Sequence, residues 1–210
     1  MPIRSLQNRA PSLPIIGTLR KGSPKPKQGE KGFGGPGRDL NEAFRFTSES
    51  ADVVAAFEKV FGSTEVSTFQ AVFYGGETPE DCFDAWHESY SAAQLTHRCD
   101  GEYVVYEESG NTSKTYSNGS RPKCIFATMT PAQKAAYKEK TGLEPCKPTG
   151  RLKMVLVQTS VDGRMSVVNL GRIGQILFLT TSKWDIVRVT QALDAYYRNN
   201  GTLKGSPFIM

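Results

Sequence analysis

Apolar residues along this chain recur at two spacings, one typical of strands and one typical of helices. Strand-like alternation or short continuous apolar runs cover 43–47, 66–74, 95–99, 103–107, 152–158, 173–180 and 206–210. Helix-like spacing covers 51–61, a segment from Thr78 with Phe83, Trp86 and Tyr90 on one face, 131–140 and 181–200. Strands and helices in this irregular order predict an α+β fold with a mixed sheet and three to four helices.

Local residues mark where several of these elements begin and end. Ser50 is a suitable N-cap for the first helix, and Gly62 stops it. Thr130-Pro131-Ala132-Gln133 is a capping box, and Gly142 closes that helix. The run at 173–180 is so continuously apolar that we expect it to be a central strand, buried on both faces.

The first 37 residues have a composition that resists both helices and central strands, because proline and glycine are frequent there. We therefore expect three parts: an extended basic arm and linker at 1–40, a single α+β domain at 41–210, and within it a cysteine-containing insert at 95–150. The chain is also expected to continue beyond Met210, because natural proteins rarely stop on three apolar residues.

Positive charge is concentrated in this arm. Up to Arg38 there are eight basic residues and one acid, a net +7, so with a total of +5 the rest carries −2. An arm of this kind suits a phosphate backbone or an acidic partner surface, although a solvated tail has the same composition.

Several classes of function find no support in the sequence. No apolar run approaches the ~20 residues that cross a bilayer, and no signal-peptide centre is present, so we expect a cytoplasmic protein without a membrane partner. There is no nucleophile elbow, phosphate-binding Gly-x-x-x-x-Gly-Lys or zincin motif. We therefore expect no enzyme activity and no small-molecule substrate.

Four cysteines in 210 residues are too few for a disulfide scaffold. His97 and Cys99 are alternate residues of a predicted strand and so point to the same side. Together with Cys124 and Cys146 they would complete a closed structural zinc site. Free thiols in a core would explain the same cysteines. We expect Cys82 to be a packing residue and His87 to be solvated or at the edge of the core.

Aromatic residues near basic ones leave room for a second function. Tyr103, Tyr106 and Tyr116 lie near Arg98, Lys114 and Arg121. Aromatic faces beside cations can stack the bases of single-stranded nucleic acid, but aromatics in strands are more often part of a core. The alternative function is therefore a zinc-containing single-strand or general nucleic-acid-binding protein.

An ordered set of short motifs spans nearly the whole chain. It comprises Pro2-Ile3-Arg4-Ser5-Leu6-Gln7, Gly17-Thr18-Leu19-Arg20-Lys21-Gly22, Phe44-Arg45-Phe46-Thr47, His97-Arg98-Cys99-Asp100-Gly101, Cys146-Lys147-Pro148-Thr149-Gly150-Arg151-Leu152-Lys153, Thr180-Thr181-Ser182 and Gly205-Ser206-Pro207-Phe208. In this order they resemble a phage-type family, the recombination directionality factors of large serine integrases.

The resemblance implies a bacteriophage or prophage protein that acts in a bacterial host cell and is not itself a recombinase. It would bind a large serine integrase around the coiled-coil insertion of that enzyme's zinc domain, and would contact DNA only indirectly. Site-specific recombination would then switch from attP × attB integration to attL × attR excision. The resemblance also favours metal binding at Cys99, Cys124 and Cys146, with His97 chosen over Cys82 as the fourth ligand.

The surface that meets the integrase is expected in the arm. Exposed apolar residues on an extended segment commonly fold onto a partner, and nearby cations add electrostatic attraction. The candidate partner-binding residues are Leu13, Ile15, Ile16, Arg20 and Lys21.

Overall fold

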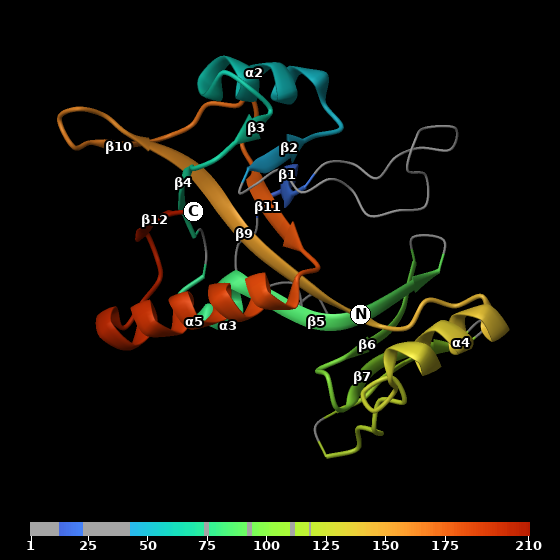
Figure 1. Ribbon diagram of the computed structural model, residues 1–210. Helices are drawn as coiled ribbons and strands as arrows, with labels where there is room; N and C mark the ends of the chain where they lie inside the picture. The colour runs from blue at the N-terminus through green and yellow to red at the C-terminus, as the bar shows by residue number, and fades with distance from the viewer. Residues whose placement is uncertain (1–12, 23–42, 74–75, 92–93, 110–111, 118) are drawn as a thin grey trace. The chain divides into compact units, whose positions relative to one another are not determined.

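The computed structural model describes residues 13–22, 43–73, 76–91, 94–109, 112–117 and 119–210 (Figure 1). Two compact units are present. Unit 1 takes Met1–Phe83, Arg151–Thr180 and Val189–Met210, and unit 2 takes Asp84–Gly150 and Thr181–Arg188. Each unit is described in turn.

The main ladder of unit 1 has the strand order β3-β2-β1-β11-β9. Its strands are β1 (Ile15–Lys21), β2 (Phe44–Thr47), β3 (Glu65–Val66), β11 (Gln175–Thr180) and β9 (Lys147–Thr159), which enters this unit at Arg151. β1 and β11 run parallel, whereas β1–β2 and β2–β3 are antiparallel. The sheet is therefore mixed and the α+β prediction is confirmed.

Three shorter strands extend this sheet. They are β4 (Gln70–Val72), β10 (Met165–Val167) and β12 (Pro207–Ile209). β4 and β10 both pair with β9, and β12 pairs with β4, all antiparallel. The predicted strand at 206–210 is thereby confirmed as β12.

Aromatic side chains fill the core of unit 1 beneath helix α2 (Ala51–Phe61). Phe57 of α2 and Phe46 of β2 are both buried and stack with ring centroids 4.0 Å apart. The helix ends at Gly62, whose φ of 78° is left-handed and whose N–H donates to the Glu58 carbonyl. The predicted 51–61 helix is confirmed.

The ladder of unit 2 has the order β5-β6-β7-β8 and is antiparallel throughout. Its strands are β5 (Phe83–Ser91), whose first residue belongs to unit 1, β6 (Gln94–Cys99), β7 (Val104–Ser109) and β8 (Thr112–Thr115). Helix α4 (Pro131–Thr141) begins at the predicted capping box, because Thr130 and Gln133 each accept the other's backbone N–H. The hairpin strands and the 131–140 helix are confirmed.

Helix α5 (Lys183–Asn200) starts among the residues of unit 2 and ends among those of unit 1. With α2, α4 and the single turn α3 (Pro79–Cys82), it makes four helices in the described part of the chain. None of them is long and apolar enough to cross a membrane.

The predicted helix after Thr78 is wrong beyond its first turn. Thr78 and Asp81 do form a capping box, but α3 ends at Cys82 and strand β5 follows. Aromatic residues favour strands, and the pairing of β5 with β6 places Glu88 opposite Arg98. The Glu88 carboxylate is fully buried, and Arg98 Nη2 lies 2.7 Å from its Oε1. This cross-strand ion pair needs the extended form.

Two other strand predictions need correction. The strand expected at 66–74 is divided into β3 and β4. The strand expected from Ile173 begins at Gln175 as β11, and the Ile173 side chain is 82% exposed. β11 does lie between β1 and β9, so its central position is confirmed.

Most of the predicted arm, and its boundary at residue 40, lie outside the described residues. The part that is described forms β1, which pairs with both β2 and β11. Two glycines allow this close approach. A Cβ at Gly17 would overlap the Phe46 ring, and one at Gly174 would overlap Ile16 and come within 2.7 Å of the Pro14 carbonyl oxygen.

Replacing Gly174 with alanine should therefore destabilise the protein. The added methyl meets the Ile16 side chain of β1 and the Pro14 carbonyl oxygen, which accepts the Gln175 N–H at the start of β11. Neither can move without disturbing the β1–β11 pairing, so a loss of about 1–3 kcal/mol of unfolding free energy is expected. Chemical denaturation measures this loss. Ile173→Ala, at an exposed neighbouring position, is the control and should change stability by less than about 0.5 kcal/mol. Equal stability of both variants and the wild type would contradict the close contact between Gly174 and β1.

Candidate metal centre

Three separate segments of unit 2 bring four potential ligands together. His97 and Cys99 are alternate residues of β6 and so point to one face of the ladder. Cys124 precedes a turn at 125–127, and Cys146 lies directly before β9. The segment around Cys124 is held to the hairpin because its N–H donates to the Glu102 carbonyl at 2.7 Å.

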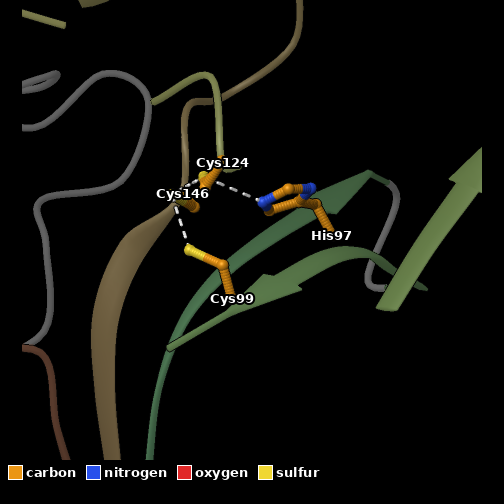
Figure 2. A group of neighbouring side chains, drawn as sticks. All are labelled: His97, Cys99, Cys124 and Cys146. Atoms are coloured by element: carbon orange, nitrogen blue, oxygen red, sulfur yellow. Dashed lines mark hydrogen bonds between the residues drawn. The ribbon is translucent and has the colours of Figure 1, made fainter. Parts of the chain in front are cut away.

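All four ligand atoms lie within 4.8 Å of one another, as the sequence predicted (Figure 2). Cys146 Sγ lies 3.8 Å from Cys99 Sγ and 3.9 Å from Cys124 Sγ. His97 Nε2 lies 3.3 Å from Cys124 Sγ. All four cysteines, including Cys82 of unit 1, are free thiols.

These separations fit a tetrahedral metal site. A tetrahedron with metal–sulfur bonds of about 2.3 Å has sulfur–sulfur edges of about 3.8 Å, and a nitrogen–sulfur edge of about 3.5 Å. The observed distances of 3.8, 3.9 and 3.3 Å agree to within a few tenths of an ångström. The cluster therefore has the donor atoms and spacing to hold a metal ion without closing any disulfide.

An apolar shell surrounds the cluster. Cys99, Cys124 and Cys146 are buried together with Val104 and Phe126, and Tyr137 of α4 packs against them. The Phe126 ring contacts the His97 ring edge-on, with centroids 5.4 Å apart, and also contacts Tyr137. Four protein ligands would fill the tetrahedron of a bound metal ion and would leave no coordination position for a reacting water, as in a structural site.

The thiols share their protons unequally. A hydrogen bond from Cys146 holds the pKa of Cys99 well below that of an ordinary thiol. The same contact, with burial, raises the pKa of Cys146, and burial raises the pKa of Cys124. Only the thiolate form of cysteine binds a metal, so binding a divalent metal would require Cys124 and Cys146 to lose their protons. The charge of the metal ion would then offset the repulsion among three buried thiolates.

The other cysteine and histidine do not join this cluster. Cys82 is buried at the end of α3, and burial raises the pKa of its thiol to about 12. This fits the expected packing role. His87 lies on β5 opposite Cys99, yet it contributes no atom to the group of four.

The basic residues that suggested base stacking are largely occupied. Arg98 binds Glu88, and Arg121 Nη1 lies 3.4 Å from Asp100 Oδ2. Lys114 lies over the Tyr116 ring, 4.7 Å from its centroid. Two of the three cations are thus paired with carboxylates, which weakens the argument for a nucleic-acid-binding face.

The predicted partner-binding residues lie in unit 1. Ile15, Ile16, Arg20 and Lys21 belong to β1, and Leu13 precedes it. Ile15, Arg20 and Lys21 are exposed, whereas Leu13 and Ile16 are half-buried. Their role in partner binding stays a prediction.

Comparison with known protein families matches residues 16–210 to one described as Gp3-like, recombination directionality factor-like. The match begins at the second residue of β1, continues through β12 and includes all four residues of the cluster. The chain belongs to this Gp3-like family. Comparisons of this Gp3-like protein with curated proteins and with solved structures found no match. The predicted resemblance is confirmed at the level of the family.

We expect the purified Gp3-like protein to contain about one tightly bound divalent metal ion per chain, measured by elemental analysis. Cys99→Ser and Cys146→Ser should each abolish this content, because a hydroxyl is a poor substitute for a thiolate ligand. Cys82→Ser is the matched control and should retain the metal. A metal-free wild-type protein, or metal retained by both ligand variants, would refute the centre.

Proposed function

We propose that this protein is a recombination directionality factor that binds a large serine integrase and switches it from attP × attB integration to attL × attR excision. The observation that carries this proposal is the family match over residues 16–210. The protein acts by binding and catalyses no reaction. It works in the cytoplasm of a bacterial host, on behalf of a phage or prophage.

The physical requirement for such a switch is modest. A ligand shifts a two-state equilibrium by the difference in its affinity for the two states. A tenfold preference for the excision arrangement corresponds to about 1.4 kcal/mol per subunit. Because a synaptic complex holds four integrase subunits, four such preferences would multiply. A rigid protein that recognises one pose of a mobile integrase segment is sufficient.

The proposed metal is zinc, in a structural role. Three thiolates and one imidazole in a closed tetrahedral set are the donors that zinc prefers. Structural zinc contributes of order 10 kcal/mol to the folding of small domains. In this protein it would hold together the hairpin, the Cys124 segment and the start of β9.

The proposed contact with the integrase is made by β1. Its exposed residues Ile15, Arg20 and Lys21, flanked by Leu13 and Ile16, would meet the coiled-coil and zinc-domain region of the enzyme. The parallel pairing of β1 with β11 supports this proposal because it presents these residues from a fixed strand. DNA is contacted only through the integrase within the synaptic complex.

Recombination in vitro tests the function. The purified protein is mixed with the serine integrase encoded in its own genome and with DNA carrying matched att sites. Recombination of attL with attR should rise from background, and recombination of attP with attB should fall, because the integrase is biased toward the excision synapse. Integrase that is active on attP × attB, yet gives the same product ratios with and without the protein, would refute the proposal.

A further inference from the structure

Two arginines occupy directly opposite positions on neighbouring strands of unit 1. In the β1–β2 ladder Arg20 pairs with Arg45, and Arg45 in turn pairs with Glu65 of β3. Directly opposite side chains on one face have Cβ atoms about 4.5–5.5 Å apart, and like charges at that separation destabilise the sheet. A pair of this kind needs a compensating anion.

No described residue forms an ion pair with either arginine. Glu65 stands opposite Arg45 on β3, but no salt bridge joins them, and neither arginine forms a side-chain hydrogen bond with another described residue. Arg45 Nε is buried without a hydrogen-bond partner. Burial and the neighbouring Arg45 charge lower the pKa of Arg20. A buried guanidinium donor without an acceptor is costly and calls for an explanation.

An open cavity lies beside the arginine couple, on the same face of the sheet. Thr18 and Thr47 form the adjacent cross-strand pair, and residues two apart on a strand share a face. These two threonines line a cavity of about 690 Å³ whose wall also includes Ile15 and Ile173. The two isoleucines are 45% and 82% exposed. One surface thus combines an unpaired arginine couple with exposed apolar side chains.

We infer that Arg20 and Arg45 together form a carboxylate-binding site for an acidic, amphipathic segment of a protein partner. The planar guanidinium offers parallel donors that match the two oxygens of a carboxylate. The segment's apolar side chains pack on Ile15 and Ile173, for which a phosphodiester backbone has no counterpart. The inference rests on the proposed integrase partnership for the identity of the partner, but the carboxylate site itself can be tested alone.

Malonate, a small dicarboxylate, probes the site without any partner. NMR of the full chain should show saturable shifts of the Nε–H signals of Arg20 and Arg45 as malonate is added. In Arg45→Gln the response of Arg20 should be at least about tenfold weaker, because one half of the site is lost. Chloride at equal ionic strength is the control. No saturable shift, or the same response to chloride, would overturn the inference.

Integrase affinity tests the site in its proposed setting. Arg20→Gln and Arg45→Gln should each bind the integrase about tenfold to a hundredfold more weakly, the loss expected for a charge-assisted hydrogen bond. Both should fold with undiminished thermal stability, because each removes one of two like charges. Arg198→Gln, an exposed arginine at the end of α5, is the charge-matched control and should bind as the wild type does.

The outcomes separate the two proposals. A wild type that responds to malonate but ignores the integrase would refute the directionality function and keep the carboxylate site. A wild type that binds the integrase with unchanged affinity in both variants would overturn the inference and keep the function. If both variants instead lose affinity for a DNA duplex while integrase binding stays intact, the anion is a phosphodiester and the inference is overturned.

Discussion

The convergence of one imidazole and three thiols within 4.8 Å is the constraint on which unit 2 depends. Apart from the strand ladder and the buried Glu88–Arg98 ion pair, its described apolar core is small. Its buried core cluster consists of the three cysteines with Val104 and Phe126, helix α4 has no buried residue, and β8 is exposed along its length. An apolar core so small offsets little of the entropy lost in ordering the residues of Asp84–Gly150 and Thr181–Arg188. A metal ion bound by the four ligand atoms would therefore fix the hairpin, the turn after Cys124 and the start of β9.

Unit 1 is stabilised in a different way, by aromatic packing and long-range strand pairing. Phe46 and Phe57 stack face to face, and Phe44 meets Phe69 and Phe178 edge-on. Its charged surface is not optimised for stability, because Arg20 and Arg45 stand opposite each other on adjacent strands. Proteins commonly keep such local costs where a partner binds. Under the two proposals, the cysteine–histidine cluster would serve structure in unit 2 and the arginine couple would serve recognition in unit 1.

The sequence predicted those features that depend on neighbouring residues. Caps at Thr130 and Gly62 locate α4 and α2, and the apolar run before Thr180 locates β11. The alternation of His97 and Cys99 indicated a shared face. The helix expected after Thr78 failed because Phe83, Trp86 and Tyr90 follow the helical period, whereas the extended form is set by pairing with Arg98, a residue on another strand. The pairing of Arg20 with Arg45 was missed for the same reason, since cross-strand register cannot be read from one segment.

The parallel pairing of β1 with β11 joins residue 15 to residue 175, and most of the chain lies between them. During translation the first of these strands leaves the ribosome long before its neighbour exists. Closing so long a loop is slow and must follow synthesis of the C-terminal third. Until then Ile15 has no neighbour on β11, although Arg20 can already pair with Arg45 of β2. A nascent or prematurely terminated chain would therefore carry the arginine couple without the apolar wall that Ile15 and Ile173 form beside it.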